Sequence, residues 1–217
     1  MAADKDSAVI AAPVAGVPAY WAQAKAELQK RDRIMNKLIP QFGDLHLVGH
    51  PDPFTTLARS VVGQQVTPKA ADAAWDKLSA ICPKMTPAQV IKAGAVQLGG
   101  CGLSKRKTEY ILDLADHFKA KRVHADLWSQ MDDEAVIAEL VQIRGITRWT
   151  AEMFLIFNLL RPNVLPLDDA GLSRASARTT FLASRSRAAM RARFRLIGNR
   201  GGPLPHGIYG VAWTRFR

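Results

Sequence analysis

The sequence predicts an all-α protein that forms a single helical domain with short loops. Apolar residues recur at intervals of three and four along most of the chain, which is the period of an amphipathic helix, and no segment alternates as a half-buried strand would. Thr-Pro pairs, glycines and acidic residues stand where these helical stretches begin or end. With 217 residues, of which 48% are hydrophobic, the chain is long enough to bury one core.

The N-terminal part of the chain begins with a segment that lacks a helical period. Residues 1–18 are rich in Ala, Pro and Val, so we expect a loose leader before a domain over residues 19–172. Helical spacing predicts a helix from Tyr20 to Leu38, and Pro40 marks its end. A second helix is predicted from four apolar residues that share one of its faces: Phe54, Leu57, Val61 and Val62.

The middle of the chain contains helices whose starts are marked by capping residues. Gly63-Gln64-Gln65 interrupts the preceding helix, and an alanine-rich, tightly packed helix is predicted for Ala70 to Ile81. Another helix is predicted for Lys105 to Lys119, after a glycine turn. That turn contains Gly99, Gly100 and Gly102. Two pairs supply an N-cap and a first-turn proline and so begin helices: Thr67-Pro68 and Thr86-Pro87.

The last predicted helices are joined by a short turn. An acidic triplet, residues 132–134, caps a helix that runs to Val141. Residues 144–148 form a tight turn into a helix from Trp149 to Leu160. An apolar segment, residues 161–167, then leads to two adjacent carboxylates at the start of a further helix.

The charge of the chain is unevenly distributed. It has 30 basic and 19 acidic residues, a formal net charge of +11, which favours a polyanion such as nucleic acid as partner. Every acidic residue lies at or before Asp169, so residues 1–169 are nearly neutral, and ten arginines with no acid follow. Residues 173–217 therefore form a separate basic tail.

Several classes of protein are excluded by composition. Two cysteines, Cys82 and Cys101, are too few for a disulfide scaffold or a four-cysteine metal site. No continuous apolar run has the length of a membrane span, and Asp4 and Asp6 stand where a signal peptide would be apolar. We expect a cytoplasmic, nucleoid-associated protein without a membrane partner.

The turn at residues 144–148 has the features of a phosphate-binding site. Its backbone N–H groups and those of the next helix would cluster and bind a phosphate without reading sequence. The DNA-binding residues predicted there are Arg144, Gly145, Thr147 and Arg148, of which Gly145 permits a positive φ and the arginines add charge. On these residues alone, an ordinary helix–helix loop is the alternative. The two carboxylates, taken alone, are most often an N-cap.

Four separated segments carry a resemblance. They are Asp52-Pro53-Phe54 with Val62-Gly63-Gln64-Gln65-Val66, then Gly102 to Lys107, Ile143 to Phe157, and Val164 to Leu172. In this order and spacing they resemble the 3-methyladenine DNA glycosylase II family of the helix-hairpin-helix DNA glycosylase superfamily, over about residues 20–172. The resemblance implies a helix-hairpin-helix DNA glycosylase fold and a monofunctional enzyme that hydrolyses the N-glycosidic bond of alkylated purines in DNA.

The resemblance also implies roles for single residues. Asp169 is the catalytic carboxylate, and Asp168 is the helix cap. Bifunctional glycosylase-lyases of the superfamily carry a Lys just after the turn, where this sequence has Trp149, so no Schiff base is expected. Trp149 and Met153 are implied as the pocket of the flipped base, where an aromatic ring attracts a cationic purine by about 0.5–2 kcal/mol. A Trp in a helix is otherwise more often a core residue.

Other residues are implied to meet DNA. Gly63, Gln64 and Gln65 are implied as the wedge that fills the gap left by the flipped base, against the alternative of a helix-breaking loop with solvated glutamines. Three basic residues before a helix are predicted to hold phosphates, or else to be solvated charges: Lys105, Arg106 and Lys107.

The sequence departs from the family in two places. Thr147 stands where the turn usually has Gly, and a β-branched residue at positive φ would cost about 1–2 kcal/mol, so either the turn adapts or phosphate binding weakens. After Leu172 no family motif is found. Synonymous codons for Ala177 to Arg217 can be chosen so that reading two bases downstream gives a charge-balanced, tryptophan-rich helical sequence. We hypothesise a frameshift between Leu172 and Arg174; a natural tail that binds DNA phosphates is the alternative.

The function expected from these observations is that of a DNA-3-methyladenine glycosylase II in base excision repair. Its partner is double-stranded DNA that contains alkylated bases, and we expect a monomer with no metal or organic cofactor. The alternative is a non-catalytic helix-hairpin-helix DNA-binding module or an inactive truncated relic of the enzyme. Asp169 favours the enzyme, whereas Thr147 and the tail favour the alternative.

Overall fold

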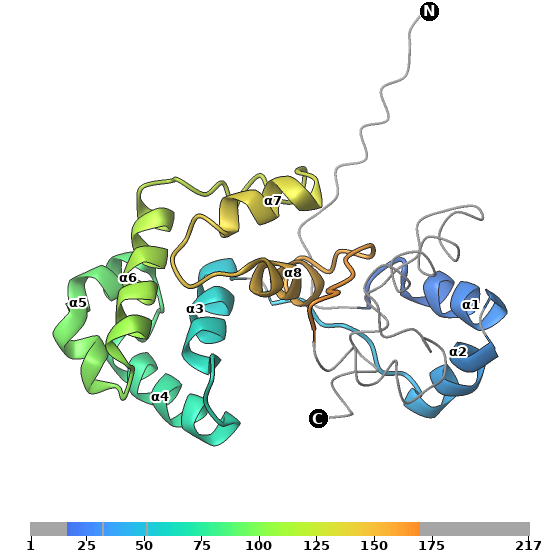
Figure 1. Cartoon of the computed structure of the whole chain (residues 1–217), viewed down its shortest axis with the longest axis horizontal. Coiled ribbons are helices and arrows are strands. Elements are labelled where there is room, and N and C mark those ends of the chain that lie inside the picture. Colours follow the sequence, from blue (N-terminus) through green and yellow to red (C-terminus); the bar gives the residue numbers. More distant parts are fainter. Residues whose placement is uncertain (1–16, 32, 51, 170–217) are drawn as a thin grey trace, which may run out of the picture.

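The computed structural model describes residues 17–31, 33–50 and 52–169, and in that part the chain is helical without a strand (Figure 1). The elements in order are α1 (Trp21–Arg31), α2 (Arg33–Leu38), the 3-10 helix η1 (Ile39–Phe42), α3 (Pro53–Gly63), α4 (Pro68–Ile81), α5 (Pro87–Gly100), α6 (Lys105–Lys119), α7 (Asp133–Leu140) and α8 (Arg148–Phe157). The all-α prediction is confirmed. The expectations for the leader up to residue 16 and for the tail lie outside the described residues.

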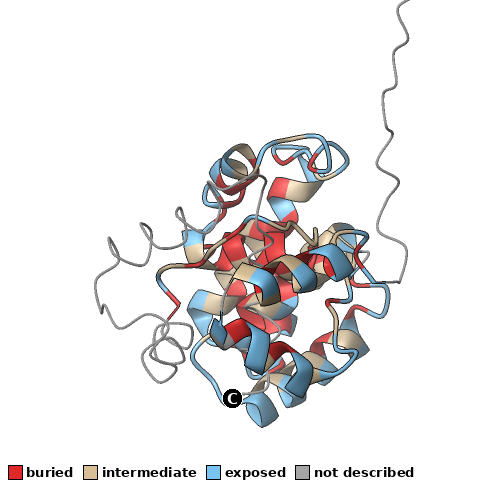
Figure 2. Ribbon diagram, turned by 90° about the vertical axis from the view of Figure 1, so that its right-hand side faces the viewer, coloured by how far each residue is buried: buried red, intermediate tan, exposed pale blue. Residues whose placement is uncertain are grey.

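The helix α8 lies in the middle of the molecule, with α1 and α2 on one side, α3 to α6 on the other and α7 above it (Figure 1). The helix α5 packs along α6, α6 packs on α3, and α7 packs on α8. Buried residues lie on the inner faces of these helices, and exposed residues lie on the outer faces (Figure 2). None of the described helices has the length and apolarity needed to cross a membrane.

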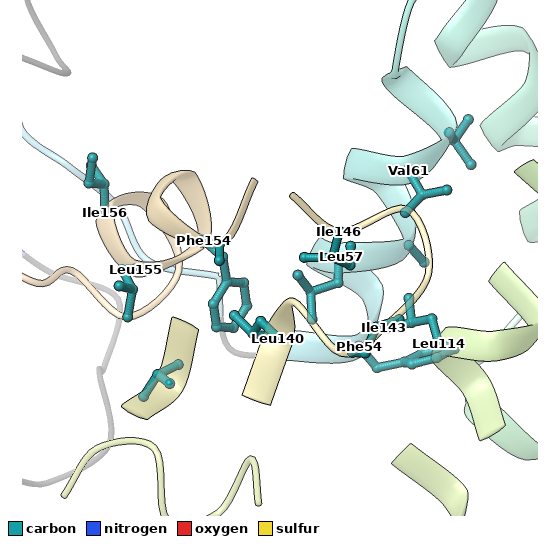
Figure 3. Packing of buried hydrophobic residues seen from close by; sticks show 14 of the residues in the cluster. Phe54, Leu57, Val61, Leu114, Leu140, Ile143, Ile146, Phe154, Leu155 and Ile156 are labelled. Atoms are coloured by element: carbon teal, nitrogen blue, oxygen red, sulfur yellow. The ribbon is translucent and has the colours of Figure 1, made fainter. Parts of the chain in front are cut away.

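The core fixes α3 and α8 relative to each other. The face predicted for α3 is confirmed as buried: Phe54, Leu57, Val61 and Val62. Figure 3 shows Phe54, Leu57 and Val61 of α3 on the side of Ile143 and Ile146, at the start of the turn, with Phe154 of α8 beside Leu140 of α7. Phe118 contacts both Phe54 and Trp128 edge-on, and Trp128 contacts Phe154, at centroid separations of 5.3, 6.0 and 5.3 Å. Such aromatic pairs add about 0.5–1.5 kcal/mol each beyond the area that they bury.

The predicted helix starts are confirmed by their capping hydrogen bonds. The side chains of Thr67, Thr86 and Asp132 each accept a hydrogen bond from the backbone N–H three residues on. Ser104 caps α6 in the same way, and α6 has the predicted bounds. Each cap satisfies a donor that the helix leaves unpaired and is worth about 1 kcal/mol.

Three expectations need correction. The glycine turn is smaller than expected, because Gly99 and Gly100 lie in the last turn of α5 and Gly102 alone has a positive φ, 85°. The helix α8 ends at Phe157 rather than Leu160, because Leu160 has a left-handed φ of 53°. The helix α4 is not tightly packed, since Leu78 is its one buried residue and its alanines are mostly turned to solvent.

The predicted helix over residues 20–38 corresponds to α1 and α2, with residue 32 between them outside the described part. The helix α2 ends at Leu38, and Pro40 lies in the first turn of η1. The structure therefore agrees with Pro40 as the end of that α-helical stretch.

Candidate functional site

The candidate catalytic residue, Asp169, is a buried carboxylate at the end of the described chain. Its residue exposure is 6%, and its Oδ2 accepts a hydrogen bond of 3.0 Å from Nε1 of Trp149. Its backbone N–H donates to the carbonyl of Pro166 at 3.1 Å, which closes a turn. Asp168 is exposed. The two adjacent carboxylates therefore differ in burial, since Asp169 is buried and Asp168 is exposed.

A cavity of about 480 Å³ lies between α3 and α8. Its wall on α8 is mostly apolar and includes Met153, Phe154 and Phe157, while the wall on α3 is polar except for Leu57. The residues that line it are His50, Asp52, Thr55, Thr56, Leu57, Arg59, Ser60, Thr150, Met153, Phe154 and Phe157. Of the two residues expected to form a base pocket, Met153 lines this cavity and Trp149 instead binds Asp169.

The hairpin turn adapts to Thr147 without strain. Thr147 has a φ of −89° and ψ of 165°, so it needs no left-handed backbone, and its Oγ1 caps α8 by accepting from the Thr150 N–H. Gly145 takes the positive φ, 86°. A Cβ at Gly145 would lie 2.2 Å from the ring of Tyr110, so only glycine fits there. The expected cost of a β-branched residue in this turn is therefore absent.

The predicted wedge lies directly beside this turn. We call residues 63–66 the wedge loop. The Nε2 of Gln64 donates to the backbone carbonyl of Gly145 at 2.9 Å, across 81 positions of sequence. Gln65 is exposed and has a φ of 55°, a left-handed conformation that costs a non-glycine residue about 1–2 kcal/mol. The structure thus brings together two of the segments that were expected to meet DNA.

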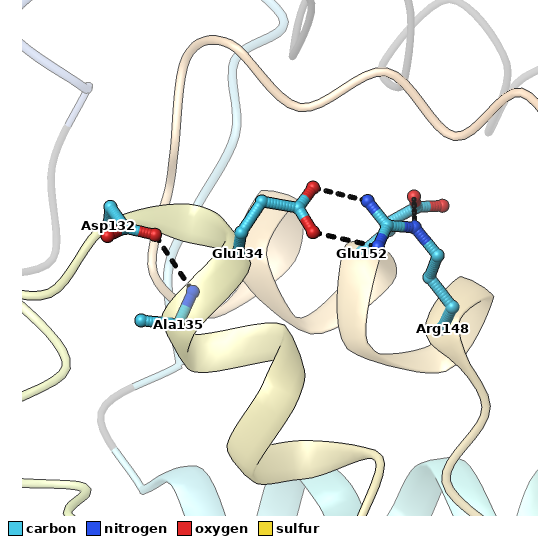
Figure 4. A network of polar contacts seen from close by, with 5 residues as sticks. All are labelled: Asp132, Glu134, Ala135, Arg148 and Glu152. Atoms are coloured by element: carbon cyan, nitrogen blue, oxygen red, sulfur yellow. Dashed lines mark hydrogen bonds and ion pairs between the residues drawn. The ribbon is translucent and has the colours of Figure 1, made fainter.

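The predicted phosphate-binding arginines of the turn are engaged by acidic residues. Arg148 pairs with both carboxylate oxygens of Glu134 on α7, and its Nε donates to Glu152 at 3.1 Å (Figure 4). The hydrogen bond from Arg148 lowers the pKa of Glu134, whereas burial raises the pKa of Glu152. Arg144 pairs with Glu109 of α6 at 3.0 Å. These pairs fasten the turn to α6 and α7.

The three basic residues in the first turn of α6 have different surroundings. Lys105 is exposed. Arg106 donates to the Tyr110 hydroxyl at 3.0 Å and lies over its ring, 5.9 Å from the centroid. Lys107 is half-buried, and its Nζ donates to the backbone carbonyl of Val62 at 2.7 Å.

Sequence reasoning missed two sets of contacts at this site. The acidic partners of the turn include Glu109 and Asp113 of α6, and the Oδ2 of Asp113 accepts from the Arg144 N–H at 2.8 Å. Their spacing of four residues places them on one helical face, which is the signal that could have found them. The bond between Lys107 and Val62 has no such signal, because it joins a side chain to a backbone carbonyl far away in the sequence.

The comparison with known families agrees with the fold and with this turn. The profile of the HhH-GPD superfamily, described as base excision DNA repair proteins, matches residues 58–199, more than half of the chain. The chain therefore belongs to the HhH-GPD superfamily of base excision DNA repair proteins. The match continues beyond Leu172, where the family motifs end, and so includes part of the tail.

Within this superfamily, relatives of the chain are named as DNA-3-methyladenine glycosylases or as an alkylbase DNA glycosidase-like protein. A DNA-3-methyladenine glycosylase of Saccharomyces cerevisiae is 35% identical over 133 residues, which is 57% of this chain and 45% of that protein. The alkylbase DNA glycosidase-like protein mag2 of Schizosaccharomyces pombe is 27% identical over 172 residues, which is 76% of this chain and 81% of that protein.

Solved structures of glycosylases have the same fold. The DNA-3-methyladenine glycosidase of Bacillus halodurans aligns with a TM-score of 0.76 at 27% identity, with 88% of each chain covered. The 3-methyladenine DNA glycosylase of Schizosaccharomyces pombe, in complex with abasic DNA, aligns with a TM-score of 0.72 at 24% identity, over 88% of this chain and 95% of that one.

Proposed function

We propose that the chain is a monofunctional DNA N-glycosylase that removes alkylated purines, including 3-methyladenine, from double-stranded DNA. The observation that carries the proposal is the buried Asp169 carboxylate, held by Trp149 at the N-terminal end of α8. The same helix lines the 480 Å³ cavity with Met153 one turn further along. A base in the cavity would contact α8 one turn away from Trp149, the residue that holds the carboxylate.

The chemistry requires one negative charge rather than a pair of acid and base. As the bond between C1′ and the base nitrogen breaks, its electrons neutralise the positive charge of the alkylated base, and the sugar becomes cationic. Asp169 stabilises that cation and orients a water molecule. The water oxygen then bonds to C1′, and its proton passes to the carboxylate. The base needs no strong general acid, because it departs neutral.

The cavity suits a flat, positively charged base. Met153, Phe154 and Phe157 supply apolar and aromatic surface, on which an electron-poor ring stacks favourably. The wall on α3 carries the exposed Asp52 carboxylate, which caps α3, and also Arg59, which pairs with Asp72. The apolar and aromatic surface on α8 therefore supports an alkylated, electron-poor purine over an undamaged one.

The turn supports phosphate binding through its backbone. Arg144 and Arg148 are paired with acidic side chains, so the N–H groups at the start of α8 supply the partial positive charge toward DNA. Because Thr147 is unstrained, the turn no longer favours the alternative of a damaged relic.

The direct test is release of free base. Duplex DNA alkylated at purines is incubated with the protein, and released bases are separated by chromatography. We expect 3-methyladenine in the soluble fraction and an abasic site that stays unbroken until alkali is added. Borohydride should trap no covalent complex, since Trp149 replaces the lysine that would form an imine. Duplex binding without base release would contradict the proposal and support a non-catalytic binding module.

A further inference from the structure

Lys107 stands in the first turn of α6 and points into the protein. Its Nζ bonds at 2.7 Å to the carbonyl of Val62, which belongs to the last turn of α3. The last carbonyls of a helix lack intrahelical partners and carry partial negative charge, so an ammonium group is favourable there. Burial lowers the pKa of Lys107, as expected for an ammonium group drawn out of water.

The wedge loop begins directly after the carbonyl that Lys107 holds. Further along the loop, Gln64 bonds to the Gly145 carbonyl, and Gln65 is exposed in a left-handed conformation. A non-glycine residue keeps such a conformation only when surrounding contacts impose it. The bond to Val62 before the loop and the bond of Gln64 within it are such contacts.

The helix α6 also holds the hairpin turn. The ring of Tyr110 packs against Gly145, and Asp113 accepts from the Arg144 N–H at 2.8 Å. Lys107, Tyr110 and Asp113 are spaced by three, so they follow one side of the helix. One face of α6 therefore supports both the wedge loop and the turn.

We propose that Lys107 is a positioning residue that holds the wedge loop, through Val62, in the conformation that enters duplex DNA when the target base leaves the stack. The inference rests on the proposed glycosylase function and deepens it. A loop fixed before binding does not have to be ordered at the moment of insertion. Lys107 therefore acts on base flipping and does not contact a DNA phosphate.

The test compares Lys107→Met and Lys107→Arg in the full chain, with Lys119→Met as the matched control from the exposed far end of α6. Single-turnover base release is measured on a duplex with 3-methyladenine paired normally, and on the same strand with that base unpaired in a bulge. Less free energy is needed to flip the target base out of a bulge than out of a paired duplex. We expect Lys107→Met to release base from the paired substrate about tenfold more slowly than the original chain, or slower still. A displacement of about 1 Å in an ordered site can lower a reaction rate by about 100-fold. On the bulge it should approach the rate of the original chain, and Lys107→Arg should recover part of the loss.

Two further results would overturn the inference. Equal losses on paired and bulged substrates would mean that Lys107 only stabilises the fold. The other result is a Lys107→Met variant with an unchanged single-turnover rate and a slope of log affinity against log salt that is smaller by about 0.9. That result would mean that Lys107 contacts a phosphate.

A fluorescence measurement separates this inference from the proposed function. A duplex with 2-aminopurine beside the target base brightens when the base leaves the stack, whether or not chemistry follows. If the original chain brightens the probe but releases no base, the proposed function fails and the response of Lys107→Met still decides the inference. A reduced response supports the role of Lys107, and an equal response overturns it. Failure of the original chain to brighten the probe overturns both.

Discussion

At the scale of single residues, the two adjacent aspartates should differ sharply in function. Asp169→Asn keeps the shape and removes the charge, so base release should fall by about 100- to 10,000-fold while duplex binding stays nearly unchanged. Asp168→Asn should change the rate by less than about threefold, because Asp168 is exposed and Asp169 is buried against Trp149. Single-turnover kinetics and fluorescence anisotropy measure the two effects. Equal losses in both variants would reverse the assignment of the pair.

The hydrogen bond from Trp149 gives a second prediction. Trp149→Phe keeps an aromatic ring but removes the Nε1–H donor to the Asp169 carboxylate. A hydrogen bond to a charged group contributes about 1.5–3 kcal/mol, so the rate should fall about 10- to 100-fold if the bond orients the carboxylate for reaction. The measurement is base release at saturating enzyme. A rate equal to that of the original chain would show that the ring alone matters.

At the scale of elements, the hairpin turn depends on the small size of Gly145. Gly145→Ala places a Cβ 2.2 Å from the Tyr110 ring and requires a φ of 86°, so we expect a loss of unfolding free energy of about 2 kcal/mol or more and weaker DNA binding. Urea unfolding and anisotropy provide both values. Adding Tyr110→Ala should relieve the clash and recover only part of the stability, because the φ remains unfavourable.

The ion pairs between α7 and α8 predict a dependence on pH. Arg148→Met leaves Glu152 buried without its cation, so its raised pKa rises further and unfolding free energy falls by about 1–3 kcal/mol near neutral pH. A carboxyl whose pKa is raised on folding costs stability above its folded pKa, and this cost disappears as pH falls through that value. The lowered pKa of Glu134 adds stability to the original chain above about pH 4.5, its usual value, and this is lost at lower pH.

Both effects act in the same direction. The difference in stability between Arg148→Met and the original chain should therefore narrow as pH falls from neutral to below about 4.5. Thermal unfolding over that range measures it. The double variant with Glu152→Gln should recover much of the loss at neutral pH. A difference that stays constant with pH would show that Arg148 stabilises by packing alone.

The same elements show how far sequence alone reaches. The bounds of α6 and the caps of three other helices followed from signals within a few residues, such as Ser104 before α6. The contact between Gln64 and Gly145 could not be predicted, because sequence spacing does not tell which side chains turn toward each other across 81 positions. For the same reason the sequence gives no sign that Lys107, a candidate phosphate contact, donates to the Val62 carbonyl.

At the scale of the whole molecule, the basic tail should dominate the salt dependence of DNA binding. The described domain is nearly neutral, and both turn arginines are paired with acids. The triple change Arg191→Gln, Arg193→Gln and Arg195→Gln should lower the slope of log affinity against log salt by about 0.9 for each phosphate that the tail no longer neutralises. Arg122→Gln, at an exposed pair with Asp116, is the control. An unchanged slope would show that these arginines do not bind phosphates.

The origin of the tail is a separate question that coding DNA answers. A frameshift between Leu172 and Arg174 predicts that removing one apparent insertion or deletion there gives the tryptophan-rich, charge-balanced reading. The superfamily match in the present frame extends to residue 199 and so counts against the expectation that resemblance ends at Leu172. A frameshift there would require the restored frame to match residues 173–199 better than the present one does. An intact frame shared by related coding sequences would exclude the frameshift.

The capping role of Thr147 has a consequence for how such proteins are found in genomes. A search that demands glycine at both ends of the turn's Gly-Ile-Thr triplet passes over this chain, although Thr147 fits its turn without a left-handed backbone. Only the first position is closed to side chains, because Tyr110 fills the space there. The last position of the triplet, which Thr147 occupies, accepts a residue whose oxygen can cap the next helix, so Ser and Thr belong in the pattern beside Gly. An aspartate would cap as well but would repel the phosphate, and a pattern that leaves it out selects for turns able to bind DNA.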